Sequence, residues 1–218
     1  PDQNTMTRQR AVGMLLVVAV LWSLGGILIK NVDWPPLALA GGRSVIAAAV
    51  AWAFLRRPRF TWSGPQLGGA AAYASTVILF VVANKYTTAA NAILLQYTSP
   101  IWVAVFGGWF IGERPTRRDW LTLLAVMGGI GLFFLDRLTV RNVWGNLAAI
   151  GSGLGFAWLA IFVRQQKQGS SLESVILGNL LTFIIGLPFM FSAAFTASNL
   201  AGIAVLGVVQ LGFSYVLF

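Results

Sequence analysis

The stretch VGMLLVVAVLWSLGGILIK (residues 12–30) decides the fold class of this chain. It has the length that an α-helix needs to cross the hydrocarbon core of a bilayer, about 20 residues. Apolar runs of this length recur along the chain, because its 15 Lys or Arg and 6 Asp or Glu fall mostly in short clusters between them. The pattern predicts an all-α fold, a polytopic transmembrane helix bundle.

Eight spans are expected, joined by connections too short to hold a catalytic domain. The last apolar run continues to the final residue, so we expect the sequence to be an incomplete record of a longer chain. The expected spans are 12–30, 36–55, 66–84, 88–111, 119–135, 145–163, 174–195 and 199–218.

Composition excludes several classes of protein. The chain is 57% hydrophobic with a mean hydropathy of +0.77, far above the range of soluble domains. The chain has a net charge of +9, but its basic residues lie mostly in the gaps between apolar runs and not on one face of a soluble fold. This distribution argues against nucleic-acid binding. There is no His or Cys, and the acidic residues fall outside the span interiors. We therefore expect no enzyme, no metal site and no cofactor.

The basic residues predict the orientation, because Lys and Arg concentrate on the cytoplasmic side. The expectation is a multi-pass protein of the cytoplasmic (inner) membrane with its N-terminus in the cytoplasm. Tryptophans at span ends (Trp34, Trp62, Trp120 and Trp144) are expected at the headgroup layer. Ten basic residues fall on one side (Arg8, Arg10, Arg56, Arg57, Arg59, Arg114, Arg117, Arg118, Arg164 and Lys167) and four on the other (Lys30, Lys85, Arg137 and Arg141).

The segment TTAANAILLQYTSPIWVAVFGGWFIGERPTRRDW (residues 87–120) is the most informative motif. Its polar residues make the helix unsuited to face lipid, and Pro100 removes a backbone hydrogen bond near mid-span. The pattern predicts a kinked helix that lines a cavity. A kink buried between packed helices is the alternative.

This segment, with its Asn-Ala…Pro stretch and its Gly-Glu-Arg-Pro exit at 112–115, resembles span 4 of the EamA family in the drug/metabolite transporter superfamily. LWSLGGILIK (21–30), PPLALAGGRSVIAAAVAWAF (35–54) and GNLAAIGSGLGFAWLAIFVRQQ (145–166) resemble its first, second and sixth spans. MTRQRA (6–11) followed by VLWS (20–23) is similar to YddG-type exporters of aromatic amino acids.

The resemblance implies ten spans built as an inverted repeat of two five-span units. Residues 1–138 would form the first repeat, with spans 1–5, and residues 139–218 an incomplete second repeat, with spans 6–8. The segment from Phe156 to Arg164 would then correspond to the segment from Trp22 to Lys30. The function implied is export of aromatic or large apolar amino acids, or of similar small metabolites, by alternating access.

Two alternatives stay open, a non-transporting membrane scaffold and a carrier of another metabolite class. The expected partners are a small-molecule substrate and the lipid bilayer, with no nucleic acid, and we expect a monomer.

Helical spacing groups aromatic and polar side chains that are candidates for substrate binding. The aromatic rings would stack on a flat apolar side chain, and the hydroxyls and amides would bond a zwitterionic head group. Packing between helices is the alternative for any single aromatic residue. The candidates are Tyr73, Thr76, Phe80, Asn91, Gln96, Tyr97, Thr98, Trp102, Trp158 and Asn179.

Arg43 is the one charge expected well inside the hydrocarbon, where a cation is costly unless it is satisfied. With Pro100 it is a candidate for a gating or structural role. It would hold a substrate carboxylate, or bond carbonyls that shift during transport. The alternatives are that it snorkels or bonds carbonyls at a fixed helix contact.

Overall fold

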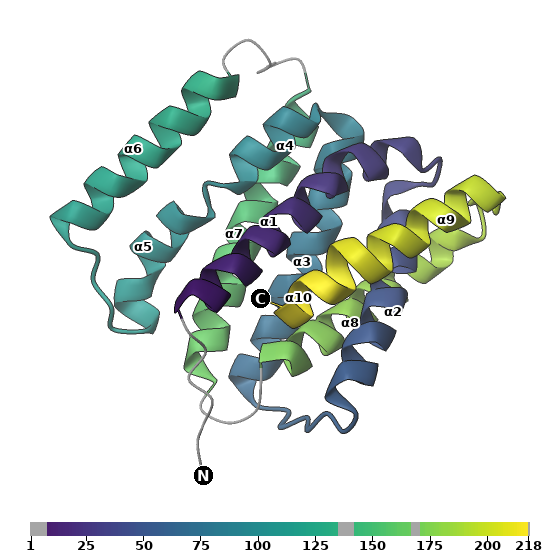
Figure 1. The fold of residues 1–218 in the computed structure, drawn as a ribbon, viewed down its shortest axis with the longest axis horizontal. Coiled ribbons are helices and arrows are strands. Elements are labelled where there is room, and N and C mark those ends of the chain that lie inside the picture. Colours follow the sequence, from purple (N-terminus) through teal and green to yellow (C-terminus); the bar gives the residue numbers. More distant parts are fainter. Residues whose placement is uncertain (1–7, 135–141, 167–170, 218) are drawn as a thin grey trace.

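The computed structural model describes residues 8–134, 142–166 and 171–217, and these ranges form helices joined by turns (Figure 1). Seven segments among them are long and apolar enough to cross a membrane. The predicted fold class, an all-helical polytopic bundle, is confirmed. In chain order the elements are α1 (Arg8–Asn31), α2 (Pro36–Leu55), α3 (Gly64–Tyr86), α4 (Ala89–Gln96), α5 (Ser99–Phe110), α6 (Arg117–Phe134), α7 (Val143–Gln165), α8 (Ser171–Met190), α9 (Ala197–Val205), a π-helical segment η2 (Leu206–Phe213) and α10 (Ser214–Leu217).

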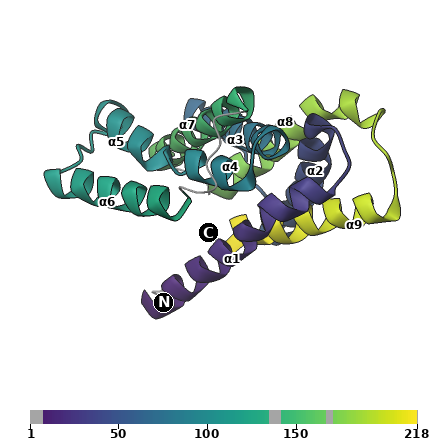
Figure 2. The same cartoon turned by 90° about the horizontal axis from the view of Figure 1, so that it is seen from above.

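Helix α6 differs from the other predicted spans. It occupies the expected span 119–135, but its 18 residues include Arg117, Arg118 and Asp119 in the first turn. The apolar run within the described residues is therefore shorter than in the seven spanning segments. Helix α6 lies at the edge of the bundle, on the side of α4 and α5 (Figures 1 and 2).

The predicted kink in the fourth span is confirmed. Helix α4 ends at Gln96, and α5 begins at Ser99 with Pro100 in its first turn. Proline has no N–H to donate, so the normal helical bond to the Gln96 carbonyl cannot form. At the break, the Thr98 hydroxyl donates to the carbonyl of Leu95 at 2.7 Å. The span thus consists of two helices with an exposed turn residue, Tyr97, between them.

Close helix contacts hold the centre of the bundle together. Helix α3 packs against α7 and α8, while α2 packs against α8 and η2. Small residues make this approach possible. A Cβ on Gly186 of α8 would lie 2.5 Å from the carbonyl oxygen of Leu37, and one on Gly155 of α7 would lie 2.8 Å from Thr76 Oγ1. These contacts fix the helices that surround the site.

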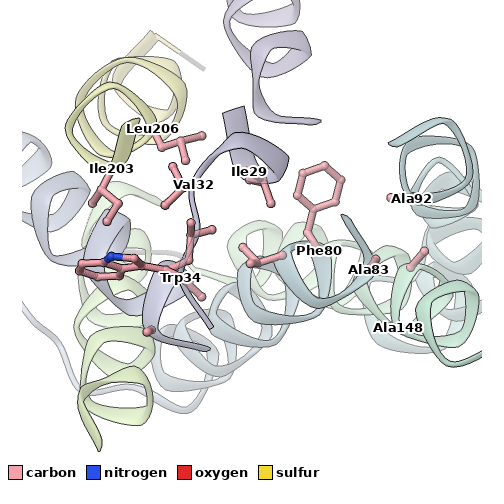
Figure 3. Close-up of a cluster of buried hydrophobic side chains, with 14 residues drawn as sticks. Ile29, Val32, Trp34, Phe80, Ala83, Ala92, Ala148, Ile203 and Leu206 are labelled. Carbon is pink, nitrogen blue, oxygen red and sulfur yellow. The ribbon is translucent and has the colours of Figure 1, made fainter. Parts of the chain in front are cut away.

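One apolar cluster joins the first three spans to the last one (Figure 3). It contains Ile29, Phe80, Ile203 and Leu206, and also Trp34 from the short connection between α1 and α2. The indole of Trp34, a residue expected at the headgroup layer, packs inside the protein, because the residue is only 5% exposed. Its indole N–H donates to the carbonyl of Ala194 at 2.8 Å, which satisfies its polar atom inside the protein.

The last span is continuous but changes its winding. Helix α9 continues into η2 and then α10, and α1 packs along η2 and α10 (Figures 1 and 2). A π-helix has i→i+5 bonds and is found frequently at functional sites. The side chains of this segment therefore depart from ordinary helical spacing.

Candidate functional site

A cavity of about 190 Å³ lies in the bundle between α1, α2, α3, the broken fourth span, α7 and the last span. Its wall combines one cation, several aromatic rings and several hydrogen-bonding side chains. The lining residues are Ala19, Trp22, Ser23, Arg43, Thr76, Val77, Phe80, Ile93, Gln96, Tyr97, Ser99, Phe156, Gln210, Leu211 and Tyr215.

The cation in this wall is Arg43 of α2, which is 1% exposed. Its Nη1 donates to Gln210 Oε1 at 2.9 Å, and its Nη2 donates to the carbonyl of Val77 at 3.4 Å. Its Nε has no hydrogen-bond partner. Among the residues that the structure describes, the single ion pair joins Arg164 and Glu113, so neutral dipoles alone face the Arg43 guanidinium. Arg43 does not snorkel, and its positive charge is held at the cavity.

The glycines of η2 bring Gln210 to Arg43. A Cβ on Gly207 would lie 2.8 Å from the carbonyl oxygen of Arg43, so η2 and α2 touch through their backbones there. A Cβ on Gly25 of α1 would lie 3.1 Å from Gln210 Nε2. The Gln210 side chain therefore lies between α1 and α2, which limits the positions it can take.

Aromatic rings form the apolar part of the cavity. The ring of Trp22 lies edge-on to Phe156, with centroids 6.1 Å apart, and 5.6 Å from the ring of Tyr215. Trp22 and Phe156 begin the two segments that correspond in the predicted repeat. Three different spans thus contribute neighbouring rings, a surface suited to stacking on a flat apolar group.

A chain of hydrogen bonds positions the polar residues of the broken span. Gln96 Nε2 donates to Ser152 Oγ at 2.9 Å, and Ser152 Oγ donates to the carbonyl of Thr76 at 2.9 Å. Ser152 is fully buried on α7, behind the two cavity residues that it connects. Because the side-chain amide nitrogen of Gln96 donates to Ser152, the side-chain oxygen Oε1 remains as an acceptor beside the cavity.

Five of the residues predicted for the site line the cavity. They come from α2, α3, the end of α4 and the turn that follows it, and they are Arg43, Thr76, Phe80, Gln96 and Tyr97.

Two further candidates form a buried pair beside the cavity. Tyr73 and Asn179 are 0% and 1% exposed, and Asn179 Nδ2 donates to Tyr73 Oη at 3.0 Å. Neither lines the cavity. The Tyr73 ring lies edge-on to Tyr215 with centroids 5.0 Å apart, so this pair supports a lining residue from behind.

The remaining candidates lie along α4, α5 and α7 without lining the cavity. Asn91 Nδ2 donates to Asn146 Oδ1 at 2.9 Å, and Trp102 Nε1 donates to Thr98 Oγ1 at 3.2 Å. The Trp158 ring stacks on Phe106 with centroids 5.3 Å apart. Pro100 is exposed at the start of α5. The break in the span turns a different face toward the cavity, formed by Ile93, Gln96, Tyr97 and Ser99.

Sequence reasoning missed the contributions of the first and last spans and of Phe156 on α7. Trp22 and Phe156 had a signal, since they occupy matching places in the predicted repeat. Gln210 was also detectable, as a polar side chain within an otherwise apolar run. Tyr215 had no such signal, because aromatic residues are common throughout these spans.

Comparison with known proteins shows the same architecture elsewhere. The sequence matches the EamA-like transporter family over residues 9–135, more than half of the chain. An uncharacterized transporter from Archaeoglobus fulgidus is 27% identical over 206 residues, which cover 94% of this chain and 74% of that protein. A solved crystal structure with no descriptive name superimposes with a TM-score of 0.71 at 18% identity, covering 97% of this chain and 78% of the other. At that identity the match shows a shared fold.

Proposed function

This chain belongs to the EamA-like transporter family, and we propose that it is a carrier that exports aromatic or large apolar amino acids, or similar small metabolites. The family and the relative from Archaeoglobus fulgidus make it a multi-pass membrane transporter. The proposed substrate class is supported by the cavity.

The observation that carries the proposal is the combination of rings and polar groups in one cavity. Trp22, Phe156 and Tyr215 offer faces and edges for a flat side chain. The side-chain oxygen of Gln96 is an acceptor for an ammonium group, and the hydroxyl of Ser23 belongs to the same cavity wall. A volume of about 190 Å³ is below the roughly 300 Å³ at which drug-sized pockets begin, so it suits a small metabolite.

The proposed mechanism is alternating access around this cavity. The two predicted repeats rock against each other, and the cavity opens to one side of the membrane at a time. The proposed orientation places the N-terminus in the cytoplasm of a cell with an inner membrane, on the basis of the ten-to-four division of basic residues. The proposed carrier acts as a monomer.

A scaffold without transport activity is the main competing function. In a scaffold, the helices would pack without a cavity near the middle of the membrane, and the buried polar side chains would be used in contacts between helices. Tyr73, Asn179 and Asn91 follow that description, since each is bonded to another side chain. Arg43 does not, because its Nε is unpaired and its guanidinium borders a cavity. This feature favours the carrier.

Uptake of labelled tryptophan by proteoliposomes that contain the complete gene product tests the proposal. Unlabelled phenylalanine, leucine, lysine and glucose serve as competitors in parallel samples. The proposal expects saturable uptake, inhibited by phenylalanine and leucine and unaffected by glucose. Uptake of labelled tryptophan no greater than in protein-free liposomes contradicts it.

A further inference from the structure

The Arg43 guanidinium has more donors than the protein satisfies. An arginine side chain carries five N–H donors and is protonated at any physiological pH. The structure gives Arg43 one bond of 2.9 Å to Gln210 and one of 3.4 Å to the carbonyl of Val77, and no bond to Nε. A cation that is buried without an anionic partner is costly, because its charge has lost water and gained only neutral dipoles.

We propose that Arg43 is the receptor for the carboxylate of the transported molecule, and that Gln210 occupies this receptor until the carboxylate displaces it. The inference rests on the proposed function, and it names the chemical class that the carrier selects, a small carboxylate with an apolar body.

Geometry and charge both favour a carboxylate over the amide that is present. The planar guanidinium fork matches the two oxygens of a carboxylate, which can accept two parallel bonds. Such charge-assisted bonds are roughly twice as strong as bonds between neutral partners. Gln210 Oε1 makes one neutral-acceptor bond to Nη1, so a carboxylate exchanges a weaker partner for a stronger one.

The apolar body of the ligand then meets the rings beside Arg43. Phe80 and Trp22 line the same cavity, and Val77 and Leu211 add aliphatic surface. A carboxylate without an apolar body would gain the contact with Arg43 and leave this surface uncovered. The site therefore discriminates against both uncharged aromatic compounds and small hydrophilic acids.

Displacement of Gln210 also changes the contact between two spans. Arg43 belongs to α2 and Gln210 to η2, which the predicted repeats place in different halves. Their hydrogen bond is a side-chain link across a helix contact otherwise made by small residues such as Gly207. Binding of a carboxylate removes this link, which gives the substrate a direct effect on how the two halves pack.

Two substitutions at one position test the proposal. Gln210→Glu supplies Arg43 with a permanent carboxylate of nearly the same shape. Gln210→Met removes the polar partner and keeps the length of the side chain. Binding of labelled tryptophan and of labelled tryptophanamide, which lacks the carboxylate, is measured on the purified full-length protein and both variants.

The wild-type protein is expected to bind tryptophan at least about tenfold more tightly than tryptophanamide, about 1.4 kcal/mol. Gln210→Glu is expected to lose this preference through weaker tryptophan binding, while its binding of tryptophanamide is retained and shows that it is folded. Gln210→Met is expected to keep the preference. Equal binding of both probes by the wild-type protein overturns the proposal, as do equal effects of the two substitutions or loss of both probes by Gln210→Glu.

The outcome separates this inference from the proposed function. Tryptophan flux through the wild-type protein, together with unchanged tryptophan binding in Gln210→Glu, refutes the carboxylate receptor and leaves the carrier intact. Absence of both flux and binding in the wild-type protein refutes the amino-acid carrier, and the receptor with it.

Discussion

Arg43 Nη1 donates to Gln210 Oε1 across 2.9 Å, although 167 positions separate the two residues in the chain. Both residues line the cavity, and both are at least nine-tenths buried. The bond joins the second span to the π-helical part of the last one. It therefore couples the electrostatics of the cavity to the packing of the spans that enclose it.

Replacement of Trp22 by alanine is expected to weaken substrate binding. Its ring lines the cavity, and stacking on the aromatic ring of a bound tryptophan would contribute about 0.5–1.5 kcal/mol beyond the buried area. The expected result is a rise in the KM for tryptophan of about 2- to 10-fold. Trp109→Ala is the matched control, since Trp109 is 78% exposed and lies outside the cavity. Equal effects of the two substitutions would contradict the assignment of Trp22.

Ser152→Ala is expected to destabilise the protein and reduce transport together. Its hydroxyl accepts from Gln96 Nε2 and donates to the carbonyl of Thr76, both at 2.9 Å. Without this hydroxyl, Gln96 Nε2 and the carbonyl of Thr76 each lose a hydrogen-bond partner, which is expected to lower the free energy of unfolding by about 1–3 kcal/mol. Thermal unfolding in detergent measures the change. Ser75→Ala is the control, because the exposed Ser75 hydroxyl bonds to its own helix, and a comparable loss in that variant would refute the argument.

Gly186→Ala is expected to disturb the contact between α2 and α8. The added Cβ would lie 2.5 Å from the carbonyl oxygen of Leu37, and overpacking of this kind costs about 1–3 kcal/mol. Gly128→Ala, at an exposed helical position with no atom within 4 Å of the added Cβ, is expected to be neutral or slightly stabilising. A lower unfolding temperature for Gly128→Ala than for Gly186→Ala would show that this helix contact is described incorrectly.

Glu113→Gln is expected to have little effect, despite its place in the Gly-Glu-Arg-Pro motif. Glu113 Oε2 lies 2.8 Å from Arg164 Nη1, but the two side chains are 55% and 59% exposed. Exposed ion pairs contribute less than about 1 kcal/mol. Tryptophan flux at low and high ionic strength checks the expectation of unchanged transport. A loss of flux as large as that of Trp22→Ala would give this pair a functional role.

The helices were predictable because hydropathy alone locates them, and the break before Pro100 followed from the missing N–H of proline. The face of the fourth span that lines the cavity was predictable only in part. Gln96 and Tyr97, both predicted for the site, line the cavity, but helical spacing continued through the break also selects Asn91, Thr98 and Trp102, which do not.

The last span shows the same limitation. Gln210 lies in a π-helical segment, where a spacing of 3.6 residues no longer identifies the residues that share a face. Its partner Arg43 was identified from the sequence because a charge inside a span is rare. That the two residues meet depends on how α2 and η2 pack, and no local pattern in either span contains this information.

Counterflow is the sharpest test of whether this protein carries tryptophan across a membrane. Proteoliposomes that contain the protein are loaded with unlabelled tryptophan and diluted into a trace of labelled tryptophan. A carrier with one site that alternates between the two sides is expected to accumulate the label transiently above its external concentration, and an excess of external phenylalanine is expected to abolish the overshoot. A flat trace, indistinguishable from that of protein-free liposomes, would contradict the account.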